Sequence, residues 1–182
     1  MAGSQPMRAQ VRAAERGDIA AMQSIGVAAG ELFREFDDPG ISHCADDPPM
    51  EAEVLAAAID AGCSWVAVEE GEVVGYMMAT PLDEHGHLEE MAVLPSAGRR
   101  GVGSALLEAG VAWSVASGHP YVTLLTFRDV PFNAPFYERR SFRELPEAEW
   151  SADLRAIVDE ESAFDLDPSL RIVMARPASG AT

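Results

Sequence analysis

The sequence predicts an α/β or α+β protein with a mixed central sheet. Apolar residues make up 48% of the 182 residues, as in ordinary soluble globular proteins. Helical and strand-like hydrophobic patterns alternate along the chain, and residues 121–127 form an apolar run typical of a strand buried on both faces. The chain is long enough for one sizeable core, so we expect a single domain over residues 1–182.

The N-terminal third predicts a short strand followed by two helices. Residues 8–14 are the candidate strand, and Asp18 is the candidate N-cap of the first helix. Apolar residues at helical spacing continue as far as Phe36, and the turn sequence at 37–40 ends that helix. A second helix is expected over 50–61, after a loop rich in Pro and Asp.

The rest of the chain predicts strands first and then alternating helices and strands. Strands at 65–68 and 73–79 flank a Glu-Glu-Gly-Glu turn and form a hairpin. A third strand is expected over 87–94, with His85 in the loop before it, and a turn rich in Gly and Arg then opens a helix. The remaining elements are a strand, a short helix, an acidic helix and a final strand, at 121–127, 134–140, 152–161 and 170–175.

The charge balance bears on partners and location. Thirteen basic residues, all arginine, stand against thirty acidic ones, and the net charge of -17 disfavours nucleic acid or an anionic membrane as a partner. We see no apolar run of the roughly 20 residues that span a bilayer and no apolar secretory segment at the N-terminus. Cys44 and Cys63 have neither disulfide-scaffold nor zinc-site spacing, so we expect a cytoplasmic protein without a metal.

One stretch of the chain is basic. Residues 99–143 hold six arginines and three acids, whereas the rest of the chain holds seven arginines and 27 acids. We therefore expect this stretch to attract a small polyanion and the remaining surface to favour cationic ligands.

The segment from 89 to 107 reads as a strand, a turn and a helix. Gly98, Gly101 and Gly103 leave little side chain in the turn, so backbone N–H groups there can approach a ligand closely. These groups lead into a helix N-terminus, which favours phosphate. A P-loop is excluded because it needs a lysine, and a dinucleotide fingerprint is excluded because Leu106 stands where a small residue is required.

Two segments resemble signatures of the GNAT superfamily of acetyl-CoA-dependent N-acetyltransferases. They are the stretch from Leu88 to Leu107, with Gly-Arg-Arg-Gly-Val-Gly at its centre, and the stretch from Asn133 to Phe142. The resemblance covers about residues 62–143 and departs from the family pattern at Gly98 and Ser141. It implies a GNAT-like fold, in which a twisted, mixed but mostly antiparallel sheet of six to seven strands is flanked by helices and splayed between the fourth and fifth strands.

The same resemblance implies acetyl-CoA as cosubstrate. The backbone of Met91, Ala92 and Val93 would pair with the pantetheine arm and polarise the thioester carbonyl. Asn133 and Phe136 would contact the cofactor from the second segment. The turn and the helix start would hold the pyrophosphate, through Arg99, Arg100, Gly101, Val102, Gly103 and Ser104.

Amine acetylation needs a base and a proton donor. The resemblance places Tyr137 beside the sulfur as the donor. Strand alternation puts His87, Glu89 and Met91 on one face, and we favour Glu89 as the base, acting through a water, with His87 as helper or substitute. Glu90 takes the role if a bulge shifts the register.

The acceptor wall is expected along the first two helices and their connection, with Glu31, Phe33 and Asp37 as candidate contacts. Acidic and aromatic residues there suit a small cationic primary amine. Acetylation of a protein N-terminus or lysine, and a non-catalytic acyl-CoA-binding module, are the alternatives. A homodimer is a further expectation, and the acidic segment 144–167 covers the acceptor cleft, covers a dimer contact or is solvated.

Overall fold

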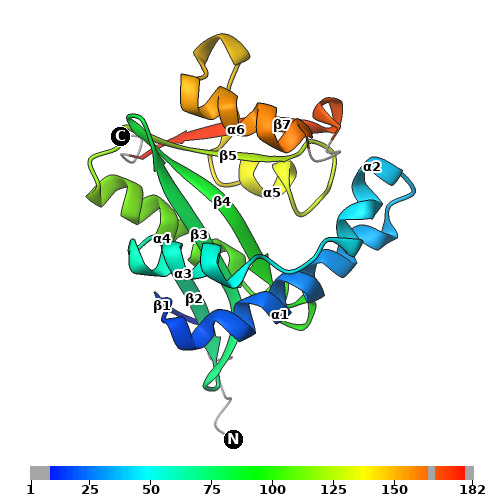
Figure 1. Cartoon of the computed structure of the whole chain (residues 1–182), viewed down its shortest axis with the longest axis vertical. Helices are drawn as coiled ribbons and strands as arrows, with labels where there is room; N and C mark the ends of the chain where they lie inside the picture. The colour runs from blue at the N-terminus through cyan, green and yellow to red at the C-terminus, as the bar shows by residue number, and fades with distance from the viewer. Residues whose placement is uncertain (1–8, 164–166, 179–182) are drawn as a thin grey trace, which may run out of the picture.

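A computed structural model describes residues 9–163 and 167–178 and contains a seven-stranded mixed sheet flanked by helices (Figure 1). The strand order is β1-β2-β3-β4-β5-β7-β6, and only β4 and β5 are parallel neighbours. This confirms the predicted fold class. The strands are β1 (Gln10–Ala13), β2 (Ser64–Glu69), β3 (Glu72–Leu82), β4 (His85–Val93), β5 (Tyr121–Phe127), β6 (Arg143–Glu144) and β7 (Arg171–Pro177).

The helices cover both faces of the sheet. Tyr76 and Met78 of β3 are buried on the side of α1 and α3, whereas the alternate residue Met77 is buried with Leu88 on the side of α4. Within the described ranges, no helix is long and apolar enough to cross a membrane. The helices are α1 (Ile19–Gly30), α2 (Pro39–Ser42), α3 (Ala52–Asp60), α4 (Val102–Ala116), α5 (Ala134–Glu138) and α6 (Ala152–Ala163).

The parallel strands β4 and β5 pair over only part of their length. Residues 86–88 of β4 pair with 122–124 of β5, and no pairing continues beyond Leu88 and Leu124. β3 continues to hold β4 as far as Val93, and β7 holds β5 as far as Phe127, so both strands remain ordered as they separate. The predicted splay is thus present, and it leaves the facing backbone edges open.

The structure corrects the expectation for His85. β3 extends to Leu82 and pairs with a strand that already begins at His85, so a second hairpin replaces the predicted loop. His85 is fully buried, because its ring stacks on Tyr121 with the centroids 4.7 Å apart. Sequence periodicity missed this because the burial depends on a residue of another strand.

Two details of the chain also differ from the sequence prediction. Asp18 does not cap α1 with its side chain: its carboxylate pairs with Arg12 at 2.7 Å and accepts the Glu15 N–H. The first helix ends at Gly30 and a 3-10 helix, Glu31–Glu35, follows it. In addition, strand β6 begins one residue before the acidic segment 144–167 and is absent from the sequence prediction.

Candidate active site

The turn between β4 and α4 presents a row of free backbone donors. The six consecutive N–H groups of residues 99–104 have no hydrogen-bond partner among the described residues. Arg99 and Gly101 both have positive φ, 59° and 90°, and such a conformation turns successive N–H groups toward one side. The turn and the α4 N-terminus therefore form a site suited to a phosphate group.

The open edge of β4 adds donors on the same side of the sheet. Leu94 N–H donates to Val74 O, which fixes the alternation of hydrogen bonds between β3 and β4. Met91 and Val93 accordingly direct their N–H and C=O groups away from β3 and into the splay, while Ala92 directs its own toward β3. Met91 and Val93 thus carry the free backbone groups of the predicted trio.

Helix α5 is fastened to the start of α4 by Arg140. Its guanidinium lies 3.7 Å from the ring centroid of Phe136 and donates to Ser104 Oγ and to Phe136 O. Gly103 lies close to the Phe136 ring and to Met91, since a Cβ on Gly103 would stand 3.5 Å from Phe136 and 3.7 Å from Met91. Sequence reasoning assigned Phe136 and Ser104 but missed Arg140, whose partner is 36 residues away in the chain.

Tyr137 lies in α5, and Asn133 directly precedes this helix. The Tyr137 ring packs against Phe136 and Phe142, with centroids 5.1 and 5.7 Å apart. Burial raises the pKa of the Tyr137 hydroxyl to about 12 against the opposing charge of Arg140, so it stays protonated at neutral pH. That hydroxyl has no hydrogen-bond partner among the described residues, and neither has the Asn133 side chain at the start of α5.

A β-bulge changes the faces of β4 at its two glutamates. Met78 pairs with Glu90 but Ala79 pairs with Leu88, so Glu89 is the extra residue. The predicted alternation is therefore wrong: Leu88 and Met91 both face α4, and His87 faces the opposite side.

The two glutamates differ in their surroundings. Glu90 accepts a hydrogen bond from the buried Tyr76 hydroxyl at 2.5 Å, and burial raises its pKa. Glu89 as a whole residue is exposed at the opening. Partial burial of its carboxyl group nevertheless raises its pKa, and repulsion from Glu90 and Glu161 adds to the effect. Glu89 is therefore the acid with a free carboxyl, and Glu161 of α6 is a neighbour that sequence reasoning did not single out.

His87 lies in the paired half of β4. Its side chain is buried, and its Nδ1 lies 2.9 Å from Thr123 Oγ1 of β5. Burial lowers the pKa of His87 to about 4, and His85 nearby acts in the same direction. His87 is therefore neutral at physiological pH and links the two strands where they begin to separate.

The predicted acceptor residues lie on the 3-10 helix after α1 and in the loop that follows it. The Glu31 carboxylate pairs with Arg34 at 3.0 Å, so its charge is already compensated. Phe33 packs against Phe127 and Phe132, with centroids 5.6 and 5.3 Å apart, and joins this segment to the end of β5. Asp37 is exposed.

The two departures from the family pattern have local structural explanations. Ser141 has a positive φ of 67°, the left-handed conformation that glycine adopts most easily, and it follows α5 as expected. Gly98 has ordinary extended dihedrals, but a Cβ there would stand 3.1 Å from Pro95 O. Arg100 is held by Glu69 of β2 at 2.7 Å, whereas Arg99 has no ion pair among the described residues.

These features coincide with a match to a known protein family. A family model described as the acetyltransferase (GNAT) family matches residues 30–142, which is more than half of the chain. The chain belongs to the GNAT family of acetyltransferases. The matched GNAT range contains the splay, the turn with free N–H groups and α5, and membership makes this protein an acyltransferase.

Solved structures resemble this GNAT protein over nearly its whole length. One is the PaiA N-acetyltransferase of Thermoplasma acidophilum with coenzyme A, 12% identical, covering 94% of this chain and 99% of that one with a TM-score of 0.68. Another is the ribosomal-protein-S18-alanine N-acetyltransferase of Escherichia coli, which is 18% identical. The match covers 96% of each chain with a TM-score of 0.64.

A third similar structure is the N-acetylglutamate synthase of Neisseria gonorrhoeae with coenzyme A and N-acetylglutamate. It is 16% identical, with a TM-score of 0.69, over 97% of this chain and 36% of that one. At these identities the likeness shows the fold alone.

Proposed function

We propose that this protein transfers an acetyl group from acetyl-CoA to a small cationic primary amine, by direct attack in a ternary complex. The observation that carries the proposal is the splay itself. Free backbone donors line one side of the opening, at Met91, Val93 and residues 99–104, and the carboxyl of Glu89 lies at the same opening.

The residues present fit acetyl-CoA. A pyrophosphate suits the six free N–H groups of the turn, with Arg99 adjacent, and an extended pantetheine arm suits the unpaired edge of β4. Phe136 of α5 and Met91 of β4 both border Gly103, and Asn133 directly precedes α5. The similar PaiA structure holds coenzyme A, which supports the same cosubstrate for this chain.

Acetyl-CoA supplies an acetyl group activated as a thioester. The Met91 and Val93 N–H groups are placed to stabilise negative charge on the carbonyl oxygen. Glu89 accepts a proton from the amine, through a water, because its carboxyl is free and its pKa is raised toward the working range. Tyr137 holds the proton that the thiolate needs on leaving. His87 is buried with its pKa lowered to about 4, so in this proposal it fixes the geometry between β4 and β5 and is not the helper or substitute base that the sequence suggested.

The acceptor class rests on charge. Outside residues 99–143 the chain is strongly acidic, and the Glu89 carboxyl lies at the opening with Glu90 next to it in the chain, which favours a cation. The two similar enzymes named for their acceptors act on a ribosomal protein and make N-acetylglutamate, so this fold serves both protein and small-molecule acceptors. A homodimer and a cytoplasmic location stay predictions from the sequence.

The first experiment is a direct assay for loss of the acetyl-CoA thioester absorbance. The panel consists of alkylamines, arylalkylamines, polyamines, aminoglycosides, amino acids and short peptides, and direct reading avoids interference by Cys44 and Cys63 with a thiol reagent. We expect turnover of one class of small amine. Turnover of peptides alone would favour a protein acceptor, and acetyl-CoA binding without turnover would favour a binding module.

Tyr137→Phe tests the proposed chemistry. We expect kcat to fall at least about 100-fold while the Kd for acetyl-CoA is retained, because only the proton is removed. Tyr121→Phe is the matched control, since Tyr121 stacks on His85 at the far end of β5. Equal turnover in both variants would remove Tyr137 from the mechanism.

A further inference from the structure

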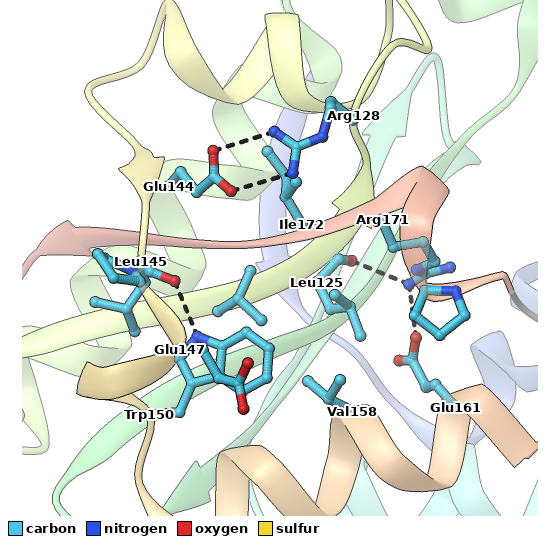
Figure 2. A pocket seen from close by; sticks show the side chains of 13 residues that line it. Leu125, Arg128, Glu144, Leu145, Glu147, Trp150, Val158, Glu161, Arg171 and Ile172 are labelled. Carbon is cyan, nitrogen blue, oxygen red and sulfur yellow. Dashed lines mark hydrogen bonds and ion pairs between the residues drawn. The ribbon is translucent and has the colours of Figure 1, made fainter.

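A cavity of about 240 Å³ lies between α6 and strands β5 and β7. The apolar residues Leu125, Val158 and Ile172 line it together with the Trp150 ring (Figure 2). Charged residues complete the lining: Arg128, Glu144, Glu147, Glu161 and Arg171. Trp150 is held in place because its indole N–H donates to Leu145 O at 2.9 Å. The cavity therefore has a fixed aromatic wall.

The cavity lies on the face of the sheet that carries His85 and His87. Odd-numbered residues of β5 share one face, on which Tyr121 contacts His85, Thr123 contacts His87, and Leu125 lines the cavity. His87 lies opposite the α4 side of β4, so α6 covers the face that α1 and α3 cover elsewhere. An acceptor entering the splay from this face meets the cavity.

Arg171 connects the cavity to the splay. The Arg128 N–H donates to Leu170 O at 2.8 Å, which fixes the alternation between β5 and β7 and turns the Leu125 carbonyl toward β4. Arg171 Nη2 lies 3.3 Å from that carbonyl oxygen and 2.7 Å from Glu161 Oε2. Its Nε is buried and has no hydrogen-bond partner among the described residues.

The charges around the cavity leave one end anionic in character and the other neutral. At the far end, Arg128 and Glu144 form two hydrogen bonds of 3.1 Å and neutralise each other. At the near end, Arg171 pairs with Glu161 at 2.7 Å and offsets its charge. Glu89, whose charge interacts with that of Glu161, is therefore the carboxylate left to attract a cation there. A ligand with a single ammonium and an uncharged, apolar remainder matches this pattern.

We propose that the cavity under α6 is a specificity pocket that holds the apolar substituent of the acceptor, while the acceptor amine lies beside Glu89. This inference rests on the proposed function and names its substrate class: a primary monoamine bearing an aryl or branched alkyl group. The volume fits, since an apolar cavity of about 150 Å³ is sufficient to bind benzene. A polyamine, with further charges along its length, does not suit the far end.

The test compares phenethylamine with ethylamine in the thioester assay. Val158→Trp fills the cavity from α6, and we expect the ratio of kcat/KM for phenethylamine over ethylamine to fall about 10- to 100-fold, with ethylamine turnover retained. Val115→Trp is the matched control, because Val115 is 49% exposed on α4 and lies outside the cavity lining.

A binding measurement covers the case in which Val158→Trp does not fold. Phenethylamine titrated into the wild-type protein with coenzyme A present is expected to change the tryptophan fluorescence saturably, and Trp150→Phe removes most of that change. Trp65 and Trp113, which pack against each other with centroids 6.1 Å apart, report any general effect on the fold.

The outcomes separate the two proposals. If both amines are turned over and Val158→Trp leaves their ratio unchanged, the pocket is wrong and the acetyltransferase proposal stands. If no amine of the panel is turned over while acetyl-CoA binds, the proposed function fails. A fluorescence change that persists in Trp150→Phe also overturns the pocket.

Discussion

The two halves of β4 meet at the bulge of Glu89 and differ in chemistry. In the paired half, residues 85–88, side chains are buried and residues 86–88 pair with β5, and burial lowers the pKa of both histidines. In the splayed half, residues 89–93, the backbone edge is open and Glu89 has a raised pKa. The comparison teaches that losing one strand neighbour converts a structural strand into a binding and reacting edge.

The largest expected effect is on catalysis in the splayed half. Glu89→Gln is expected to lower kcat by about 100- to 10,000-fold. In the wild type, the rate falls as the pH drops through the raised pKa of Glu89, because the protonated form cannot accept a proton. The variant lacks this acidic limb. Glu84→Gln, in the turn before β4, is the control. If Glu90→Gln, and not Glu89→Gln, abolished the fall in rate at acid pH, Glu90 would be the base.

In the paired half, the expected effect is on stability at acid pH. The pKa of His87 is 6.5 in the unfolded chain and about 4 in the folded protein, so between these values the unfolded state binds more protons. Stability is therefore lost as the pH falls from 6.5 to 4, by up to about 3 kcal/mol from this group. In His87→Gln, which has no imidazole to protonate, this part of the acid-induced loss of stability is expected to be absent. Denaturant unfolding at several pH values measures it, and an unchanged slope would contradict the assignment.

A smaller loss of stability is expected from overpacking the paired half. A Cβ on Gly86 would stand 2.8 Å from Ser114 Oγ and 2.9 Å from Trp113. Gly86→Ala is expected to lower the free energy of unfolding by about 1–3 kcal/mol while acetyl-CoA affinity is retained. The control is Gly17→Ala, since Gly17 has open space around it. A Gly86 variant as stable as wild type would mean that α4 moves away freely.

The smallest expected effect concerns Arg99 in the turn after the splayed half. Arg99→Ala is expected to raise the Kd for coenzyme A by about two- to fivefold at low salt, because backbone N–H groups carry most of the phosphate binding. The difference shrinks as salt is added. Arg16→Ala, at the other end of the molecule beside Asp60, provides the comparison. A hundredfold loss would assign the phosphate to the side chain instead.

The cosubstrate side of the site was largely predictable from the sequence. The turn, the helix start and α5 lie within two short segments, and their free donors follow from local backbone conformation around Arg99 and Gly101. The ladder geometry then selected Met91 and Val93 among the predicted strand residues. That selection, and the Arg140 contact with Ser104, required knowledge of the fold.

The acceptor side was decided by tertiary structure. Simple alternation failed at Glu89 because a bulge depends on pairing with β3, and His85 is buried by a residue of β5. Glu161 and Arg171 meet Leu125 and Glu89 only after α6 and β7 fold back over β5. The sequence alone determined the fold class and the donor turn, because these follow from local periodicity and local backbone conformation. The base's surroundings and the pocket needed the folded chain, because burial and charge proximity arise between residues far apart in sequence.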